Sequence, residues 1–181
     1  MGLLRRSRGF TLVEAMIVVV VIGILAVLAI VGYKAWIRTS YMAEAYDLIA
    51  HIRSAEESFK AENGVYLDIS GALDNQHLYP AAPPGAFKTA WGGPCALCTH
   101  PWTSLTVQPQ APVAFGYALQ AAGTPIITLT DPSTTPPNLT VLMSQPWYVV
   151  EAVGDINGDG IFTRVYGFSS TTQLLVDAEG N

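Results

Sequence analysis

The sequence predicts an α+β fold, in which one long N-terminal helix packs on an antiparallel sheet made by the C-terminal part of the chain. Two observations carry this prediction. An apolar run at residues 10–36 continues without a break into an amphipathic stretch at 37–63. Short runs rich in β-branched and aromatic residues then follow one another across 113–181. Because the strands follow the helix and do not alternate with further helices, we expect an antiparallel sheet on the amphipathic half-helix.

Residues 10–36 are long and apolar enough to cross a membrane. From Ala15 to Tyr33 no residue is charged, and a spanning helix needs about 20 predominantly apolar residues. The preceding segment, 1–9, is basic, with arginines at positions 5, 6 and 8. Cytoplasmic flanks of membrane helices are enriched in Lys and Arg. We therefore expect a cytoplasmic N-terminus, a membrane-spanning half-helix at 10–36 and an exported remainder.

The junction between Gly9 and Phe10 precedes the apolar run. An ordinary secretory signal is cut after its apolar core, whereas cleavage here would leave the helix on the mature chain. Glu14 lies inside the apolar segment, where an ionisable residue is costly and usually has a partner. The new amine of Phe10 could pair with Glu14 of a neighbouring copy. The alternative is a carboxylate near the membrane surface that is protonated or reaches water.

The sequence from Arg6 to Glu14 reads R-x-x-G-F-T-L-V-E and resembles the type III signal of type IV prepilins and the related pseudopilins. This resemblance implies that a prepilin peptidase cuts after Gly9 and methylates Phe10. It also implies that Glu14 registers subunits during assembly. Many pilins have proline where this chain has Val31, so the helix kink of those pilins is not expected from the sequence.

Two further segments resemble pilins. The sequence E-N-G-V-Y at 62–66 resembles the helix exit of many pilins, and W-Y-V-V-E-A-V-G-D-I-N-G-D-G at 147–160 resembles the C-terminal hairpin of type IVa-like pilins from delta-proteobacteria. The resemblance implies a filament subunit.

The amphipathic half-helix has one apolar stripe and a clear end. Asn63-Gly64 is a helix stop signal, which predicts one helix from about Thr11 to about Glu62. Residues 64–112 are rich in Gly, Pro and Asn and predict a long connecting loop with short helical or strand pieces. Strands are expected within 113–121, 125–130, 147–154, 161–168 and 172–177. The stripe consists of Met42, Ala45, Tyr46, Ile49, Ile52, Ala55 and Phe59.

Cys95 and Cys98 lie in the part of the chain that we expect to be exported. Cysteines in oxidising compartments tend to form disulfides, so a Cys95–Cys98 disulfide is the leading interpretation. Zinc binding with His77 and His100 has suitable ligand types but loose spacing. Covalent haem attachment would need histidine directly after the second cysteine, where Thr99 stands, and a thioredoxin-like redox role would need a strand–helix context.

Asp155, Asn157 and Asp159 alternate before Gly160, which resembles the first half of a calcium loop. The twelfth position is Tyr166, where such loops carry Glu, so Ca²⁺ would need further ligands, and Glu151 is expected near the base of the loop. The alternative is a plain hairpin turn, because Asn-Gly and Asp-Gly are favoured turn dipeptides. No other cofactor is expected.

The composition excludes several function classes. The chain has nine basic and 14 acidic residues, and an acidic body argues against nucleic-acid binding. The histidines form no triad pattern, so we expect a non-enzyme. The expected role is a type IV pilus subunit, made in the inner membrane with its C-terminal domain in the periplasm, then assembled by self-association with the pilus machinery into an extracellular filament. The rivals are a minor pilin, a type II secretion pseudopilin, or a membrane-anchored binding or redox protein.

Overall fold

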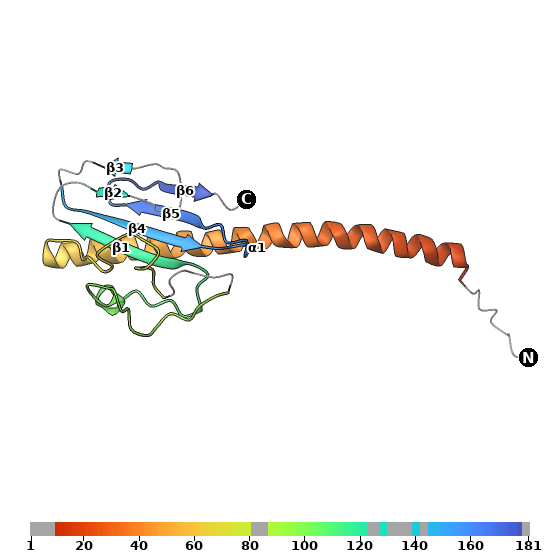
Figure 1. The fold of residues 1–181 in the computed structure, drawn as a ribbon, viewed down its shortest axis with the longest axis horizontal. Coiled ribbons are helices and arrows are strands. Elements are labelled where there is room, and N and C mark those ends of the chain that lie inside the picture. The colour runs from red at the N-terminus through yellow and green to blue at the C-terminus, as the bar shows by residue number, and fades with distance from the viewer. Residues whose placement is uncertain (1–9, 81–86, 123–126, 130–138, 142–144, 179–181) are drawn as a thin grey trace, which may run out of the picture. The chain divides into compact units, whose positions relative to one another are not determined.

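The computed structural model describes residues 10–80, 87–122, 127–129, 139–141 and 145–178. The chain divides into two compact units, residues Met1–Thr39 and Ser40–Asn181. The order of elements follows the expected α+β arrangement, with helix first and antiparallel strands after it (Figure 1). The sequon Asn138-Leu139-Thr140 begins outside the described residues.

Helix α1 spans Leu12–Asn63 without interruption, close to the predicted limits. It continues through Gly23 and Gly32, where weak helix propensity could have allowed unwinding, and through Val31. The run of Val and Ile before residue 32 would be a poor helix former in water. In lipid, however, a helix is the one single-segment structure that satisfies its own backbone groups.

The main sheet of the second unit has four antiparallel strands in the order β1-β4-β5-β6. All four lie within runs that the sequence predicted or overlap them closely. The strands are β1 (Gly116–Ala122), β4 (Trp147–Gly154), β5 (Thr163–Phe168) and β6 (Leu174–Ala178). Strand β4 is buried along its whole length, which makes it the centre of the domain.

The C-terminal part of α1 packs on one face of this sheet. Ala45, Ile49 and Ile52 are fully buried on the helix and join a core with alternate residues of the strands, including Tyr148 and Val150. The approach is close at Gly167 of β5. A Cβ built on this residue would lie 2.8 Å from Cγ2 of Ile49, so any larger residue would push the helix away from the sheet. The predicted packing of helix on sheet is confirmed.

The opposite face of the sheet is also covered, which the sequence did not predict. Trp147, Val149 and Phe168 form one apolar cluster with Leu73, and Leu78 packs with Val153 in another. The start of the connecting loop therefore closes the second face. This explains why β4 reads as a nearly continuous apolar run and not as an alternating one.

A buried ion pair lies on that second face. Nη1 of Arg164 on β5 donates to Oε1 of Glu151 on β4, and Nη2 donates to the side-chain oxygen of Asn75 at 2.8 Å. Both charged residues are nearly inaccessible to solvent. Because a buried charge without its partner is costly, this pair ties the loop at Asn75 to the centre of the sheet. Glu151 lies three residues before the end of β4, on the hairpin whose loop is 155–160, and its carboxylate is engaged by Arg164.

A second small sheet pairs β2 (Ile127–Leu129) with β3 (Leu139–Val141). Strand β2 falls in the predicted run 125–130, but β3 was missed. Only three residues pair on each side, too few for a periodic signal in the sequence.

The connecting region holds little regular structure, as predicted. Its described part contains one short 3-10 helix, η1 (Trp102–Leu105). Single bridges join Tyr79 to Tyr117 and Thr89 to Val113. The bridges and the aromatic contacts around Trp91 pin this long segment to strand β1 and the residues before it.

Glu56 of α1 is a carboxylate buried in the core. Glu56 is 0% exposed. Its Oε2 accepts a hydrogen bond from the backbone N–H of Leu67 at 3.1 Å, and its Oε1 has no hydrogen-bond partner among the described residues. Burial raises the pKa of Glu56 to about 7; the Leu67 N–H opposes this shift, and the negative charges of Glu57 and Asp68 add to it. The carboxyl group fixes the exit of the helix into the loop and favours its neutral form.

This burial predicts that Glu56 makes the domain less stable as pH rises. The unfolded chain releases the proton near the ordinary pKa of 4.5, whereas the folded chain holds it up to about 7. Stability is therefore highest below about pH 4.5, falls between these two values and levels off above about pH 7. We expect Glu56→Gln to gain melting temperature relative to the unmodified chain as pH rises from 4.5 to 8, measured by circular dichroism. Glu62→Gln, an exposed control, should not; equal curves for both variants would contradict the prediction.

Candidate assembly site

The start of helix α1 is organised by Thr11. Its hydroxyl oxygen accepts a hydrogen bond from the backbone N–H of Glu14 at 3.3 Å, and its carbonyl oxygen accepts one from the N–H of Ala15 at 3.1 Å. Thr11 is thus the N-cap, a role that serine and threonine fill well. The spacing Thr-x-x-Glu was a readable capping signal in the sequence that the initial interpretation did not use. The cap begins the helix directly after Phe10.

The carboxylate of Glu14 is exposed, and in the described part of the chain it has no hydrogen-bond or ion-pair partner. Glu14 is in the first turn of α1, where the helix dipole favours a negative charge. Phe10 is the first described residue and is 76% exposed. Gly9 lies outside the described residues, so the cleavage call remains a prediction. The Glu14 carboxylate, in the first turn after the N-cap, is therefore available to a partner from outside the chain.

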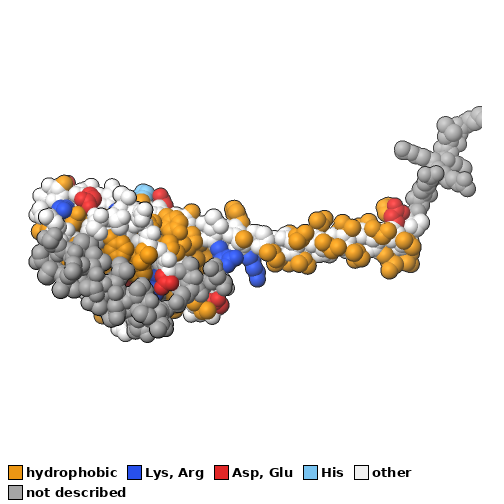
Figure 2. All heavy atoms as spheres, turned by 90° about the horizontal axis from the view of Figure 1, so that it is seen from above, with side chains coloured by type: hydrophobic (Ala, Val, Ile, Leu, Met, Phe, Trp, Pro, Cys, Tyr) orange, Lys and Arg blue, Asp and Glu red, His pale blue; other side chains and the backbone are white. Residues whose placement is uncertain are grey.

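Apolar side chains gather along the N-terminal part of α1 and are exposed to the surroundings (Figure 2). The helix contains an 18-residue window with mean hydropathy 3.2, none of which is buried inside the chain. By length and composition it is the one described helix able to cross a membrane. Burial of each Val, Leu or Ile side chain contributes about 1.5–3 kcal/mol, so this surface demands an apolar partner.

Comparison with known proteins finds a family model that matches the N-terminal part of the chain, including the start of α1. The family described as "Prokaryotic N-terminal methylation motif" matches residues 4–30. The chain is 40% identical over 68 residues to the "Type IV major pilin protein PilA" of Myxococcus xanthus (strain DK1622) and 39% identical over 60 residues to the "Fimbrial protein EcpC" of Eikenella corrodens. A "Fimbrial protein" of Pseudomonas aeruginosa is 32% identical over 74 residues. Over part of its length, the chain is thus similar to type IV pilins and fimbrial proteins.

The likeness to these pilins is partial. The alignments cover 38%, 33% and 41% of this chain for the Myxococcus, Eikenella and Pseudomonas proteins, and 31%, 39% and 48% of those proteins. The chain therefore spans less than half the length of the curated relatives it matches. No solved structure matches it significantly. The names of these relatives describe pilin and fimbrial proteins.

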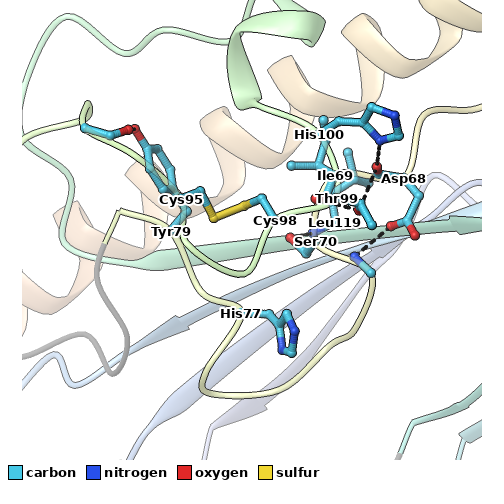
Figure 3. The surroundings of a disulfide bond; sticks show 12 residues. Asp68, Ile69, Ser70, His77, Tyr79, Cys95, Cys98, Thr99, His100 and Leu119 are labelled. Atoms are coloured by element: carbon cyan, nitrogen blue, oxygen red, sulfur yellow. Dashed lines mark hydrogen bonds between the residues drawn. A yellow bond between two sulfur atoms is a disulfide. The ribbon is translucent and has the colours of Figure 1, made fainter.

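The two cysteines of the chain form the predicted disulfide. Cys95 and Cys98 are bonded to each other within the connecting loop, with Cα atoms 5.3 Å apart (Figure 3). Both side chains pack against the main core. A ring this short removes little entropy from the unfolded chain, on the order of 2 kcal/mol. Its effect is therefore mainly local.

The residues that follow the disulfide are hydrogen-bonded to the backbone of residues 68–69. The N–H and hydroxyl of Thr99 both donate to the carbonyl oxygen of Ile69, at 2.7 and 2.9 Å. Nδ1 of His100 lies 2.7 Å from the carbonyl oxygen of Asp68. These bonds place the ring beside the chain that leaves α1.

Both histidines of the zinc interpretation are engaged elsewhere. The rings of His77 and His100 lie apart from the sulfur atoms in Figure 3. His77 Nδ1 is 2.7 Å from Oδ1 of Asp74. Burial tends to raise the pKa of Asp74, but hydrogen bonds from His77 and Gln76 outweigh it and lower the pKa. With the sulfurs joined to each other, the described residues hold no group of three or more His, Cys, Asp or Glu side chains suited to a metal.

The loop 155–160 closes on its own hydrogen bonds. Asp155 accepts from the N–H groups of Gly158 and Gly160, at 2.7 and 3.1 Å. Asp159 accepts from the N–H of Ile161 and the side-chain amide of Asn157, both at 2.7 Å. The acidic turn therefore forms without an ion, although each oxygen retains a second lone pair. Calcium binding by Asp155, Asn157 and Asp159 stays a prediction.

We predict that Ca²⁺ raises the melting temperature of the detergent-solubilised chain. With a dissociation constant of about 1 mM, as in weak extracellular sites, about 10 mM Ca²⁺ contributes about 1.4 kcal/mol, or about 3–6 °C in a chain of this size. Asp155→Ala and Asp159→Ala should abolish the rise, and Glu62→Gln, at an exposed position of α1, is the control for general charge effects. A melting curve indifferent to Ca²⁺ and to chelator leaves the hairpin turn as the full explanation.

Proposed function

We propose that this chain is a structural subunit of a type IV pilus. It is made as a precursor in the inner membrane, cut between Gly9 and Phe10, methylated on Phe10 and packed through α1 into a helical filament. Prepilin peptidase and the assembly machinery of the inner membrane are its proposed partners. The observation that carries the proposal is the exposed apolar N-terminal half of α1, whose first turn holds an acid, Glu14, with no partner among the described residues.

The apolar half-helix supports both stages of this life cycle. In the precursor, lipid covers the side chains from Ala15 to Tyr33, with the basic segment 1–9 on the cytoplasmic side. In a filament, the same side chains of neighbouring copies cover one another. A head-to-tail contact that does not close generates an open fibre. The globular domain then remains outside, in the periplasm first and on the cell surface later.

Glu14 supports assembly over a simple membrane tether. A tether needs neither an acid within the apolar run nor a cleavable junction before it. In the filament, the amine of Phe10 and the carboxylate of Glu14 from adjacent copies would lie in a medium of low dielectric constant, where an unpaired charge is expensive and a pair is far less so. Pairing removes both costs together.

Processing is predicted at the Gly9–Phe10 bond. Intact-mass measurement on filaments sheared from cells should find a chain beginning at Phe10 and carrying one added methyl group. Its amount also separates roles: a dominant species indicates the major subunit, and a trace indicates a minor pilin. A mature chain that still begins at Met1, or one cut beyond residue 30, would refute the proposed processing.

Glu14→Val should abolish filaments without impairing membrane insertion. The substitution removes a charge from the apolar segment, which eases insertion, but it leaves the Phe10 amine of a neighbour unpaired. We expect membrane levels equal to those of the unmodified chain and at least about tenfold fewer filaments by electron microscopy, since one lost pair costs more than the 1.4 kcal/mol of a tenfold change. Glu62→Val, at the exposed end of α1, is the matched control. Normal filaments from Glu14→Val would remove the role assigned to Glu14.

A further inference from the structure

Two cations of α1 have no partner among the residues that the structure describes. Lys34 is exposed and Arg38 partly exposed on α1, and neither makes a hydrogen bond or an ion pair with any residue that the structure describes. Every other described Lys or Arg has a partner. These are Arg53 with the carbonyls of Thr171 and Thr172, Lys60 with Tyr66, Lys88 with Glu44, and Arg164 with Glu151 and Asn75.

An acid-bearing groove lies on the second unit. One wall is the face of α1 from Glu44 to Glu62, and the other is the loop from Ser104 to Val113, enclosing about 1030 Å³. Within this groove the side chain of Asp47 is 78% exposed, and its nearest cationic partner is His51 at 3.7 Å. One turn earlier, Glu44 already binds Lys88 and the N–H of Ala114. Asp47 is therefore the carboxylate at this end that is free to take a new partner.

Lys34 and Arg38 are not helical neighbours of Asp47 in the sequence of α1. Helical side chains meet when they are three or four residues apart, whereas Arg38 precedes Asp47 by nine residues, about 14 Å along one helix. Lys34 precedes it by 13 residues, about 20 Å. Lys34 and Arg38 are themselves one turn apart, about 6 Å, so they form a compact pair of charges. That pair matches the short acidic edge formed by Glu44 and Asp47.

We propose that Lys34 and Arg38 of one copy dock at the Asp47 end of the groove of a second copy. The contact rests on the proposed filament and gives it a charge-matched register. Asp47 is favoured over Glu62, the acid at the far end of the groove, because it requires the smaller axial offset between parallel helices. In the precursor the same cations lie beside lipid headgroups, and the rival explanation is that they bind only the membrane surface.

Charge reversal separates these two explanations. The double variant Lys34→Glu/Arg38→Glu should produce at least tenfold fewer filaments at unchanged membrane level, because positive charge on the exported side is not needed for insertion. Adding Asp47→Lys should restore filaments to within about threefold of the unmodified chain, since every copy then carries both reversed partners. Adding Glu62→Lys makes the same charge change about 22 Å further along α1 and should not restore them.

The outcomes decide the contact. Normal filaments from the double variant, or restoration by both lysine substitutions or by neither, would overturn it, and restoration by neither would favour the lipid explanation.

A second measurement needs no variant. Carbodiimide treatment of unmodified filaments should join the Lys34 amine to the Asp47 carboxylate, and the distance along α1 makes any such link intermolecular. Its absence, with links elsewhere, also overturns the contact. Absence of filaments from the unmodified chain overturns the proposed function itself.

Discussion

The structure depends on one helix, α1, whose second half packs on the sheet and whose first half has an apolar window with no cover within the chain. From Ser40 onward, the apolar stripe of α1 packs on the chain's own sheet. Ala45, Ile49 and Ile52 are fully buried there. The apolar window before them has no cover within the chain. Since each exposed aliphatic side chain forfeits about 1.5–3 kcal/mol of burial, the first half favours an apolar partner. The second half of α1 and the sheet share a core of their own, and under the proposed function the partner of the first half is lipid in the precursor and other copies in the filament.

Much of this architecture was readable from the sequence because it depends on local patterns. Asn63-Gly64 fixed the predicted end of the helix within one residue, and the runs at 147–154 and 161–168 became the central strands β4 and β5. The N-terminal methylation motif, matched at residues 4–30, was readable for another reason. A basic segment, a polar junction and an acid inside an apolar run are each improbable by chance, and they occur together within 14 residues.

The rest depended on tertiary contacts that local patterns do not reveal. Glu56 has the charge of a surface residue, although its spacing from Ile52 and Phe59 places it on the buried stripe. The spacing of the apolar residues along the helix predicts burial at this position, whereas the charge of the side chain predicts exposure. Arg164 and Glu151 lie on different strands, so their pairing depends on the register of β4 and β5. The cover of the second sheet face by Leu73 and Leu78 comes from a loop whose path no periodicity describes.

Charge adds a constraint on how copies associate that apolar burial alone cannot supply. A chain with 14 acidic and nine basic residues repels its own copies, and loss of residues 1–9 would remove three of the basic ones. Apolar helix surfaces overcome this repulsion, because burial scales with area and repulsion is screened beyond about 8–10 Å at physiological salt. Yet a surface of Val, Ile and Leu has weak preference for one axial register over another. Charges discriminate between registers more than they add affinity. In the proposed filament, Glu14 at one end of the apolar segment and Lys34 with Arg38 at the other are charged groups that can discriminate between those registers.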